Sequence, residues 1–390
     1  MFSIRTSEIK YVFQRFVEPD LESHHANRVN FIYELHRARG LKFSDDRDRI
    51  FAWLGHFSAR MTNQELSAME ADYQSTEAQV YTDVAVRALK GDIDNGNGLA
   101  LITLAAVQHM DLQCGSKVSL QDGIEMQVPV KDTLPTWVPD WRTYQSFILS
   151  EPISPFCAHG GSLPKLDIDE KRRLLRIWGL KVDMIENCSQ VLSDKEFHMK
   201  ADPANAQPAV ETIWRDICRH DSFTLRVKYV NGQDSLFACM QTLSNGGMQA
   251  AGREKRPYHE IPISWWLEEQ AMYLVKIFGQ SDVVAPDVRK LAKRAGSERK
   301  DEQWSRLATG ASKNRKFART LSGYYVLGPQ VMEAGDVICV LFGGKLPFCL
   351  RPCGSRYLLV GECYVHGLMN GEAMGTREQC EFAEECFEIA

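Results

Sequence analysis

The sequence lacks an apolar run long enough to cross a bilayer, which needs about 20 residues. Its longest apolar stretch, residues 99–107, has about half that length. The N-terminal segment mixes Arg5, Glu8 and Arg15 with apolar side chains and contains no continuous apolar core of the secretory kind. We therefore predict no membrane span and no secretory signal. A cytoplasmic location is expected, with the nucleus as the alternative.

The sequence also lacks a large excess of charge of either sign. It has 46 Lys and Arg against 51 Asp and Glu, a net charge of −5. A general nucleic-acid binder needs excess cations that release phosphate counterions, so no nucleic-acid partner is expected. Hydrophobic residues make up 44% and charged residues 25% of the chain, which excludes disordered, collagen-like and coiled-coil classes.

Recognisable catalytic motifs are missing as well. The 390 residues contain no G-x-S-x-G elbow, no P-loop and no H-E-x-x-H segment. The glycine pairs at 246–247 and 343–344 are isolated turn glycines, too few to cradle a phosphate. No cofactor is expected. Whether the protein is an enzyme stays open at this point, and the missing motifs favour a protein that is not an enzyme.

Eleven cysteines, an odd number, are scattered without the close spacing of a disulfide scaffold, which predicts reduced thiols. Cys349, Cys353, Cys363 and His366 could together hold a tetrahedral zinc ion. The favoured alternative places them at buried positions of short strands, because zinc ligands usually come as C-x-x-C pairs on turns. No metal site is therefore expected.

The apolar pattern predicts an α+β protein with a helical N-terminal part, a mixed middle region and a small antiparallel β-barrel or meander near the C-terminus. Residues 28–39 and 76–90 have helical spacing, and residues 98–110 read as a buried helix. From Gly335 the chain changes to short apolar runs separated by turn residues, closed by a hairpin dipeptide at 370–371.

These changes of pattern divide the chain into parts. We expect a helical region over 1–110, a mixed α/β region over 111–285, a basic linker or solvated helix over 286–322, a small antiparallel β module over 323–374 and an acidic tail over 375–390.

A proline-interrupted aromatic segment, residues 134–142, offers the first candidate groups. Asp140 stands between Trp137 and Trp141, whose indole rings could desolvate the carboxylate and raise its pKa, as suits a general acid or base. The favoured alternative is a turn aspartate that accepts backbone N–H bonds after Pro139. The two tryptophans are binding candidates because they could line an apolar pocket, although buried core is the usual place for tryptophan.

Glu362 and His366 are the second candidate pair. In a strand, residues four apart face the same side, so Glu362 could orient the imidazole of His366 for proton transfer. The favoured alternatives are a structural Glu–His hydrogen bond or a surface pair. If the protein is an enzyme, its catalytic candidates are Asp140, Glu362 and His366.

Four segments together carry a family resemblance: residues 45–55 (DDRDRIFAWLG), 134–142 (LPTWVPDWR), 229–243 and 327–372. In order and spacing they are similar to the region that follows the HET domain in fungal heterokaryon-incompatibility proteins. Members of that family are implicated in non-self recognition and programmed cell death, with the HET domain as the presumed effector. The motifs of the HET domain itself, L-S-Y-x-W-G and L-W-I-D-x-x-C-I-N-Q, do not occur in these 390 residues.

The resemblance therefore implies a heterokaryon-incompatibility-like regulatory or recognition protein without intrinsic catalysis, acting through protein partners. The alternative is a cofactor-free isomerase, cyclase or hydrolase acting on an apolar small metabolite, so a small-molecule ligand also stays open. A third alternative is a truncated relative that keeps the fold without the activity. An in-frame L-S-Y-x-W-G segment upstream in the genome would identify that case.

Overall fold

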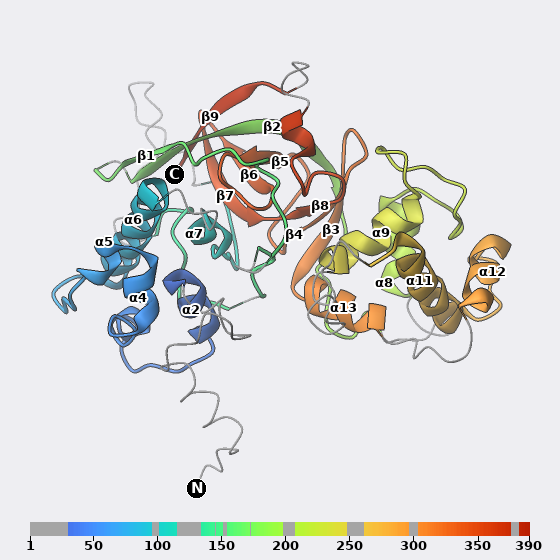
Figure 1. Cartoon of the computed structure of the whole chain (residues 1–390), viewed down its shortest axis with the longest axis horizontal. Coiled ribbons are helices and arrows are strands. Elements are labelled where there is room, and N and C mark those ends of the chain that lie inside the picture. The colour runs from blue at the N-terminus through green and yellow to red at the C-terminus, as the bar shows by residue number, and fades with distance from the viewer. Residues whose placement is uncertain are drawn as a thin grey trace, which may run out of the picture.

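Helices flank a curled β-sheet on two sides (Figure 1). This computed structural model describes residues 30–95, 101–114, 134–144, 146–150, 154–171, 173–197, 207–247, 261–295, 303–375 and 382–390. The α+β class predicted from the sequence is confirmed, with helices leading the described chain and most strands in its C-terminal part. None of the helices in these ranges combines the length and apolarity needed to cross a membrane.

The N-terminal helices lie together on one side of the sheet (Figure 1). They are α2 (Phe31–Ala38), α3 (Asp48–Phe51), α4 (Phe57–Thr62), α5 (Gln64–Ser67), α6 (Glu77–Asn95) and α7 (Ile102–Ala105). Asn30 caps α2, because its side chain accepts a hydrogen bond of 3.0 Å from the backbone N–H of Tyr33. The helix predicted over 98–110 is short: α7 follows Leu101, which has a positive φ of 67°, and the chain leaves helical geometry after Ala106.

The sheet has the strand order β5-β6-β7-β9-β2-β3-β4-β8, with β1 and β5 also pairing with β2. Its strands are β1 (Leu166–Asp169), β2 (Leu174–Cys188), β3 (Arg315–Thr320), β4 (Tyr325–Pro329), β5 (Val337–Leu341), β6 (Phe348–Cys353), β7 (Arg356–Glu362), β8 (Tyr364–Val365) and β9 (Glu384–Ile389). The 15-residue β2 pairs with different neighbours along its length, which curls the sheet. The sheet is not a closed barrel, and β7 and β9 meet through the single pair of Tyr357 and Ile389.

Side chains alternate between the two faces of the sheet, so the strands contribute to two separate hydrophobic cores. Cys339 and Leu341 of β5 pack against the N-terminal helices, whereas Ile338 and Val340 belong to the core on the other face. Successive side chains of a strand point to opposite faces, so a strand buried on both faces reads as a continuous apolar run. This accounts for the short, wholly apolar runs of the C-terminal part.

A second helical group lies beyond β3 and β4 (Figure 1). It contains α8 (Ala209–Thr212), a π-helical continuation (Ile213–Ile217), α9 (Ser235–Leu243), a short 3₁₀ turn (Asn245–Gly247), α11 (Ile263–Phe278), α12 (Pro286–Arg294) and α13 (Gln303–Ser312). These helices share a core with the sheet through Phe317 and Tyr325.

Helices and strands also occupy the range predicted as a basic linker or solvated helix and the range predicted as an acidic tail. The range 286–322 contains α12, α13 and β3. The acidic end of the sequence supplies β9, which pairs with β2 from Leu175↔Ile389 to Leu180↔Glu384. Glu384 is exposed, whereas Phe387 and Ile389 are fully buried against β2.

Candidate functional site

Asp140 lies in a turn and is engaged by its neighbour Arg142. The backbone N–H of Arg142 donates to Oδ1 at 3.0 Å, and its guanidinium donates at 2.9 and 2.8 Å. Burial alone would raise the pKa of Asp140, but the hydrogen bonds from Arg142 outweigh burial and hold that pKa below its ordinary value. The bonding is that of the turn interpretation, and the carboxylate stays ionised at neutral pH.

Trp137 and Trp141 are each 1% exposed and belong to the core under the N-terminal helices. Trp137 donates from Nε1 to the carbonyl of Arg173 at 3.3 Å. The guanidinium of Arg39 lies 4.8 Å from the ring centre of Trp141, in cation–π geometry. Neither tryptophan lines either of the two cavities described below.

The structure does not bring Glu362 and His366 together as a pair. β7 ends at Glu362, and β8 is only Tyr364–Val365, so the strand alternation is interrupted at Cys363. Glu362 therefore faces the 146–150 loop, and His366 faces the second helical group. The prediction assumed one continuous strand, which this break removes.

Glu362 is 2% exposed and densely bonded. It accepts from the backbone N–H and the hydroxyl of Ser150 at 3.1 and 2.7 Å and from the backbone N–H of Leu149. Arg315 lies 3.5 Å from its Oε1. Burial raises the pKa of Glu362, and the charge of Arg315 together with the Ser150 and Leu149 bonds opposes that rise.

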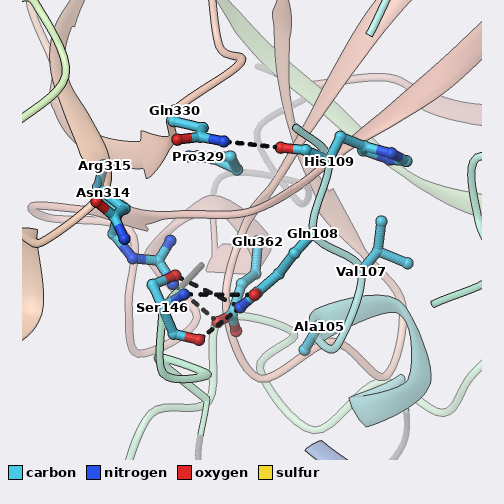
Figure 2. Close-up of a pocket in the computed structure, with 10 residues that line it drawn as sticks. All are labelled: Ala105, Val107, Gln108, His109, Ser146, Asn314, Arg315, Pro329, Gln330 and Glu362. Carbon is cyan, nitrogen blue, oxygen red and sulfur yellow. Dashed lines mark hydrogen bonds and ion pairs between the residues drawn. The ribbon is translucent and has the colours of Figure 1, made fainter. Parts of the chain in front are cut away.

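A small cavity lies beside this carboxylate, between α7, the 146–150 loop, β3 and β7 (Figure 2). Its volume is about 20 Å³, which is room for a single water molecule. Gln108 closes one side by donating to the carbonyl of Ser146 at 2.6 Å, and Gln330 donates to the carbonyl of His109 at 3.2 Å. A space of this size is too small for a metabolite.

Two further buried basic side chains lie near this cavity. His36 on α2 is 1% exposed, and burial, followed by the positive charges of Arg39 and Arg315, holds its pKa well below its ordinary value. Burial lowers the pKa of Arg39 to about 9, against the opposing charge of Asp140. The N-terminal helices thus meet the sheet across a layer of buried polar side chains.

A larger cavity of about 220 Å³ lies between the sheet end and the second helical group. Its walls combine rings, amides and a few other side chains: Phe156, Phe237, Trp266 and Tyr364; Asn231, Gln233, Gln241 and Asn370; His366, Glu372, Met369, Ile261, Ile263 and Gly367. Of the three catalytic candidates only His366 reaches this cavity, and only Glu362 reaches the small one.

His366 is fixed in one protonation state. Its Nε2 lies 2.7 Å from Oε1 of Gln233, which can only accept, so Nε2 carries the proton. Its Nδ1 then accepts from the hydroxyl of Tyr364 at 3.0 Å. Burial lowers the pKa of His366 to about 4, so the ring is neutral at physiological pH.

The four zinc candidates do not form one cluster. Cys353 is bonded to Cys114 as a disulfide, against the expectation of reduced thiols throughout. The thiol of Cys363 donates to the carbonyl of Pro347 at 3.5 Å, and Cys349 is fully buried. Within the described ranges, no three His, Cys, Asp or Glu side chains are arranged to hold a metal ion.

The larger cavity contains residues that the sequence did not single out, above all Gln241 and Phe237. Trp266 lies in α11, whose apolar spacing is typical of a helix that faces a core. Gln241 lies in α9, all of whose residues are buried. The one available signal in the sequence was a polar residue within an apolar helix. Whether such a residue lines a cavity depends on neighbours far away in the chain.

Comparison with known proteins finds a family match in the C-terminal part of the chain. Residues 285–383, which contain α12, α13, strands β3 to β8 and α14 (Glu372–Gly375), match the Het-6 beta-barrel domain family. The predicted resemblance to fungal heterokaryon-incompatibility proteins is thereby confirmed.

A particular relative is heterokaryon incompatibility protein 6, OR allele, of Neurospora crassa. It is 23% identical over 388 aligned residues, which cover 87% of this chain. The chain spans about half the length, 50%, of this curated relative. No solved structure matches the chain.

Proposed function

We propose that this chain is a recognition component of the heterokaryon-incompatibility type, which takes part in non-self recognition through protein contacts and not through catalysis of its own. The observation that carries the proposal is the similarity to heterokaryon incompatibility protein 6 across 87% of the chain. A cytoplasmic location, with the nucleus as the alternative, belongs to the same proposal.

The placement of the candidate groups favours recognition over the enzymatic alternative. An acid–base mechanism needs its groups within hydrogen-bond reach of one bound substrate. Glu362 lines the small cavity, His366 lines the larger one, and Asp140 lines neither. Each is also engaged internally, by Ser150, Gln233 and Arg142 respectively.

An exposed aromatic pair offers a contact surface. Tyr144 and Phe147 are 44% and 56% exposed, and their rings meet edge to face with centroids 6.2 Å apart. The backbone beneath them is fixed, because Arg315 donates to the carbonyl of Phe147 at 2.8 Å. Exposed aromatic rings on a rigid backbone are typical of the centres of protein interfaces.

The proposed partner is a protein that carries the HET domain. The 390 residues contain neither of the HET segments, and the proposal assigns the effector step to the partner. The test is a pull-down from a filamentous-fungal extract at low salt, with the retained proteins identified by mass spectrometry. We expect a HET-domain protein among those retained by the wild-type chain.

Phe147→Ser and Leu163→Ser make a matched pair of variants, since both side chains are apolar and exposed, at 56% and 68%. We expect Phe147→Ser to lose the HET-domain partner and Leu163→Ser to keep it, with equal melting temperatures. Failure of the wild type to retain any HET-domain protein would count against the proposal. If both variants retain the HET-domain protein equally well, the Tyr144–Phe147 surface is not the contact surface.

A further inference from the structure

The larger cavity has the walls of a site for a flat ligand. Four rings face it from separate parts of the chain: Phe156 before β1, Phe237 on α9, Trp266 on α11 and Tyr364 on β8. The position of the indole of Trp266 depends on Gly247, which has a φ of +72° and where a Cβ atom would lie only 2.1 Å from the ring. The rings are held by four different parts of the fold, so the aromatic walls of the cavity are preformed.

Gln241 gives this slot an unused polar group. Its side chain is 1% exposed, and neither its amide nitrogen nor its amide oxygen has a hydrogen-bond partner among the described residues. Leaving a buried polar group unpaired costs about 1–3 kcal/mol. Since Gln241 lines the cavity, a ligand with one donor and one acceptor on the same edge would satisfy both amide atoms.

The charges of the walls restrict the ligand further. The described residues that line the cavity include no Lys or Arg, and His366 is neutral. Glu372, an ionisable acid at the rim, accepts from the backbone N–H of Asn370 at 2.7 Å. Within the described lining an anion would meet a carboxylate and no cation, which favours a neutral ligand over a phosphorylated or carboxylated one.

We propose that this cavity binds a neutral, bicyclic heteroaromatic molecule of the purine-base type, stacked among the rings and paired edge-on with the amide of Gln241. The size agrees, because a cavity of about 150 Å³ accommodates benzene and this one has about 220 Å³. The ligand adds a small-molecule input to the protein-contact role, and it is independent of that role.

The test is calorimetric titration of the full chain with three probes at pH 7. Adenine has the proposed shape, edge and charge. Indole has the bicyclic shape but lacks the paired donor and acceptor, and adenosine 5′-monophosphate adds the anionic group. We expect one adenine per chain, with indole and the monophosphate each binding at least about tenfold more weakly. If adenine does not bind, or if indole or the monophosphate binds as tightly as adenine, the proposal is overturned. This outcome needs only the wild-type chain.

Two variants make the role of Gln241 specific. Gln241→Leu removes the amide at similar volume, and Gln270→Leu does the same at a residue that is also buried and unpaired among the described residues but lies outside the cavity. We expect Gln241→Leu to weaken adenine at least about tenfold and Gln270→Leu to leave its affinity unchanged. Both variants should melt at or above the wild-type temperature. Unchanged adenine affinity in Gln241→Leu, with the fold intact, overturns the assignment.

Discussion

Arg315 and Glu362 form an ion pair 3.5 Å apart in which each side chain is 3% exposed. Arg315 begins β3 and Glu362 ends β7, and the 146–150 loop bonds to both, so the pair ties two parts of the sheet to that loop. Arg315 also holds one unsatisfied nitrogen, since its Nε has no partner among the described residues. The pair is therefore a structural joint whose disruption should be measurable.

Arg315→Met is expected to lower the free energy of unfolding by about 3–5 kcal/mol at pH 7, because it leaves the Glu362 carboxylate buried without its cation. Adding Glu362→Gln removes that uncompensated charge, so the double variant should lose less than the sum of the two single losses. Urea unfolding of all four proteins in the cycle checks this. Strictly additive losses would contradict a direct interaction between the two side chains.

The lowered pKa of His366 predicts that the folded protein loses stability in acid. Its folded-state pKa of about 4 lies below the ordinary value of 6.5, so between these values the unfolded chain binds a proton that the folded chain does not. Stability from this group is complete above pH 6.5 and falls with decreasing pH until about pH 4, by roughly 3 kcal/mol in total. His366→Gln keeps a donor for Gln233 and does not titrate.

The measurement compares the free energy of unfolding of wild type and His366→Gln at pH 7, 6 and 5. We expect the wild-type curve to fall more steeply, by up to about 1.4 kcal/mol per pH unit. Other buried histidines contribute equally to both proteins, so the difference isolates His366. Parallel curves would mean that the ring is not held neutral in the folded state.

At Gly179 the paired strands β2 and β5 lie too close together to leave room for a side chain. A Cβ atom at this position would lie 2.4 Å from the carbonyl oxygen of Val340, a backbone atom that cannot rotate away. Gly179→Ala should therefore lower the free energy of unfolding by about 1–3 kcal/mol. Gly55→Ala is the control, since nothing lies within 4 Å of its Cβ position. Equal melting temperatures for the two variants would show that the strands separate easily there.

The Cys114–Cys353 disulfide joins residues that are 239 positions apart. Under non-reducing conditions we expect Cys114→Ser to lose about 2–4 kcal/mol of stability, since the cross-link restricts the unfolded chain. With dithiothreitol present, the wild type and the variant should become equally stable. Peptide mapping without reduction should recover the linked pair. Free thiols at both positions in the purified protein would contradict the bond.

The fold class could be predicted because local patterns suffice for it. The spacing of Ile32 and Leu35 marks α2, and the apolar run from Val337 to Leu341 marks β5, before any tertiary contact is known. β9 was hidden because half of its residues are Glu, which is depleted in strands. Its strand state depends on Phe387 and Ile389 reaching β2, about 200 residues earlier in the chain.

The site was less predictable for the same reason. Gln233, Gln241 and His366 meet in one cavity, but no spacing rule links three residues on separate elements. The expected Glu362–His366 pair relied on one uninterrupted strand, and the break at Cys363 sends the two side chains to different cavities. Asp140 was ambiguous because its role depended on Arg142, whose side-chain direction the sequence does not encode.

The long β2 also sets an order of events during translation. It leaves the ribosome well before β5 and β9, its partners at residues 337–341 and 384–389, have been synthesised. Until then the backbone of Leu175 to Met184 has no strand to pair with on those sides, and such open edges attract other chains. Deletion of β9 would leave part of that edge permanently unpaired, so a variant without residues 384–389 should aggregate more readily than the wild type.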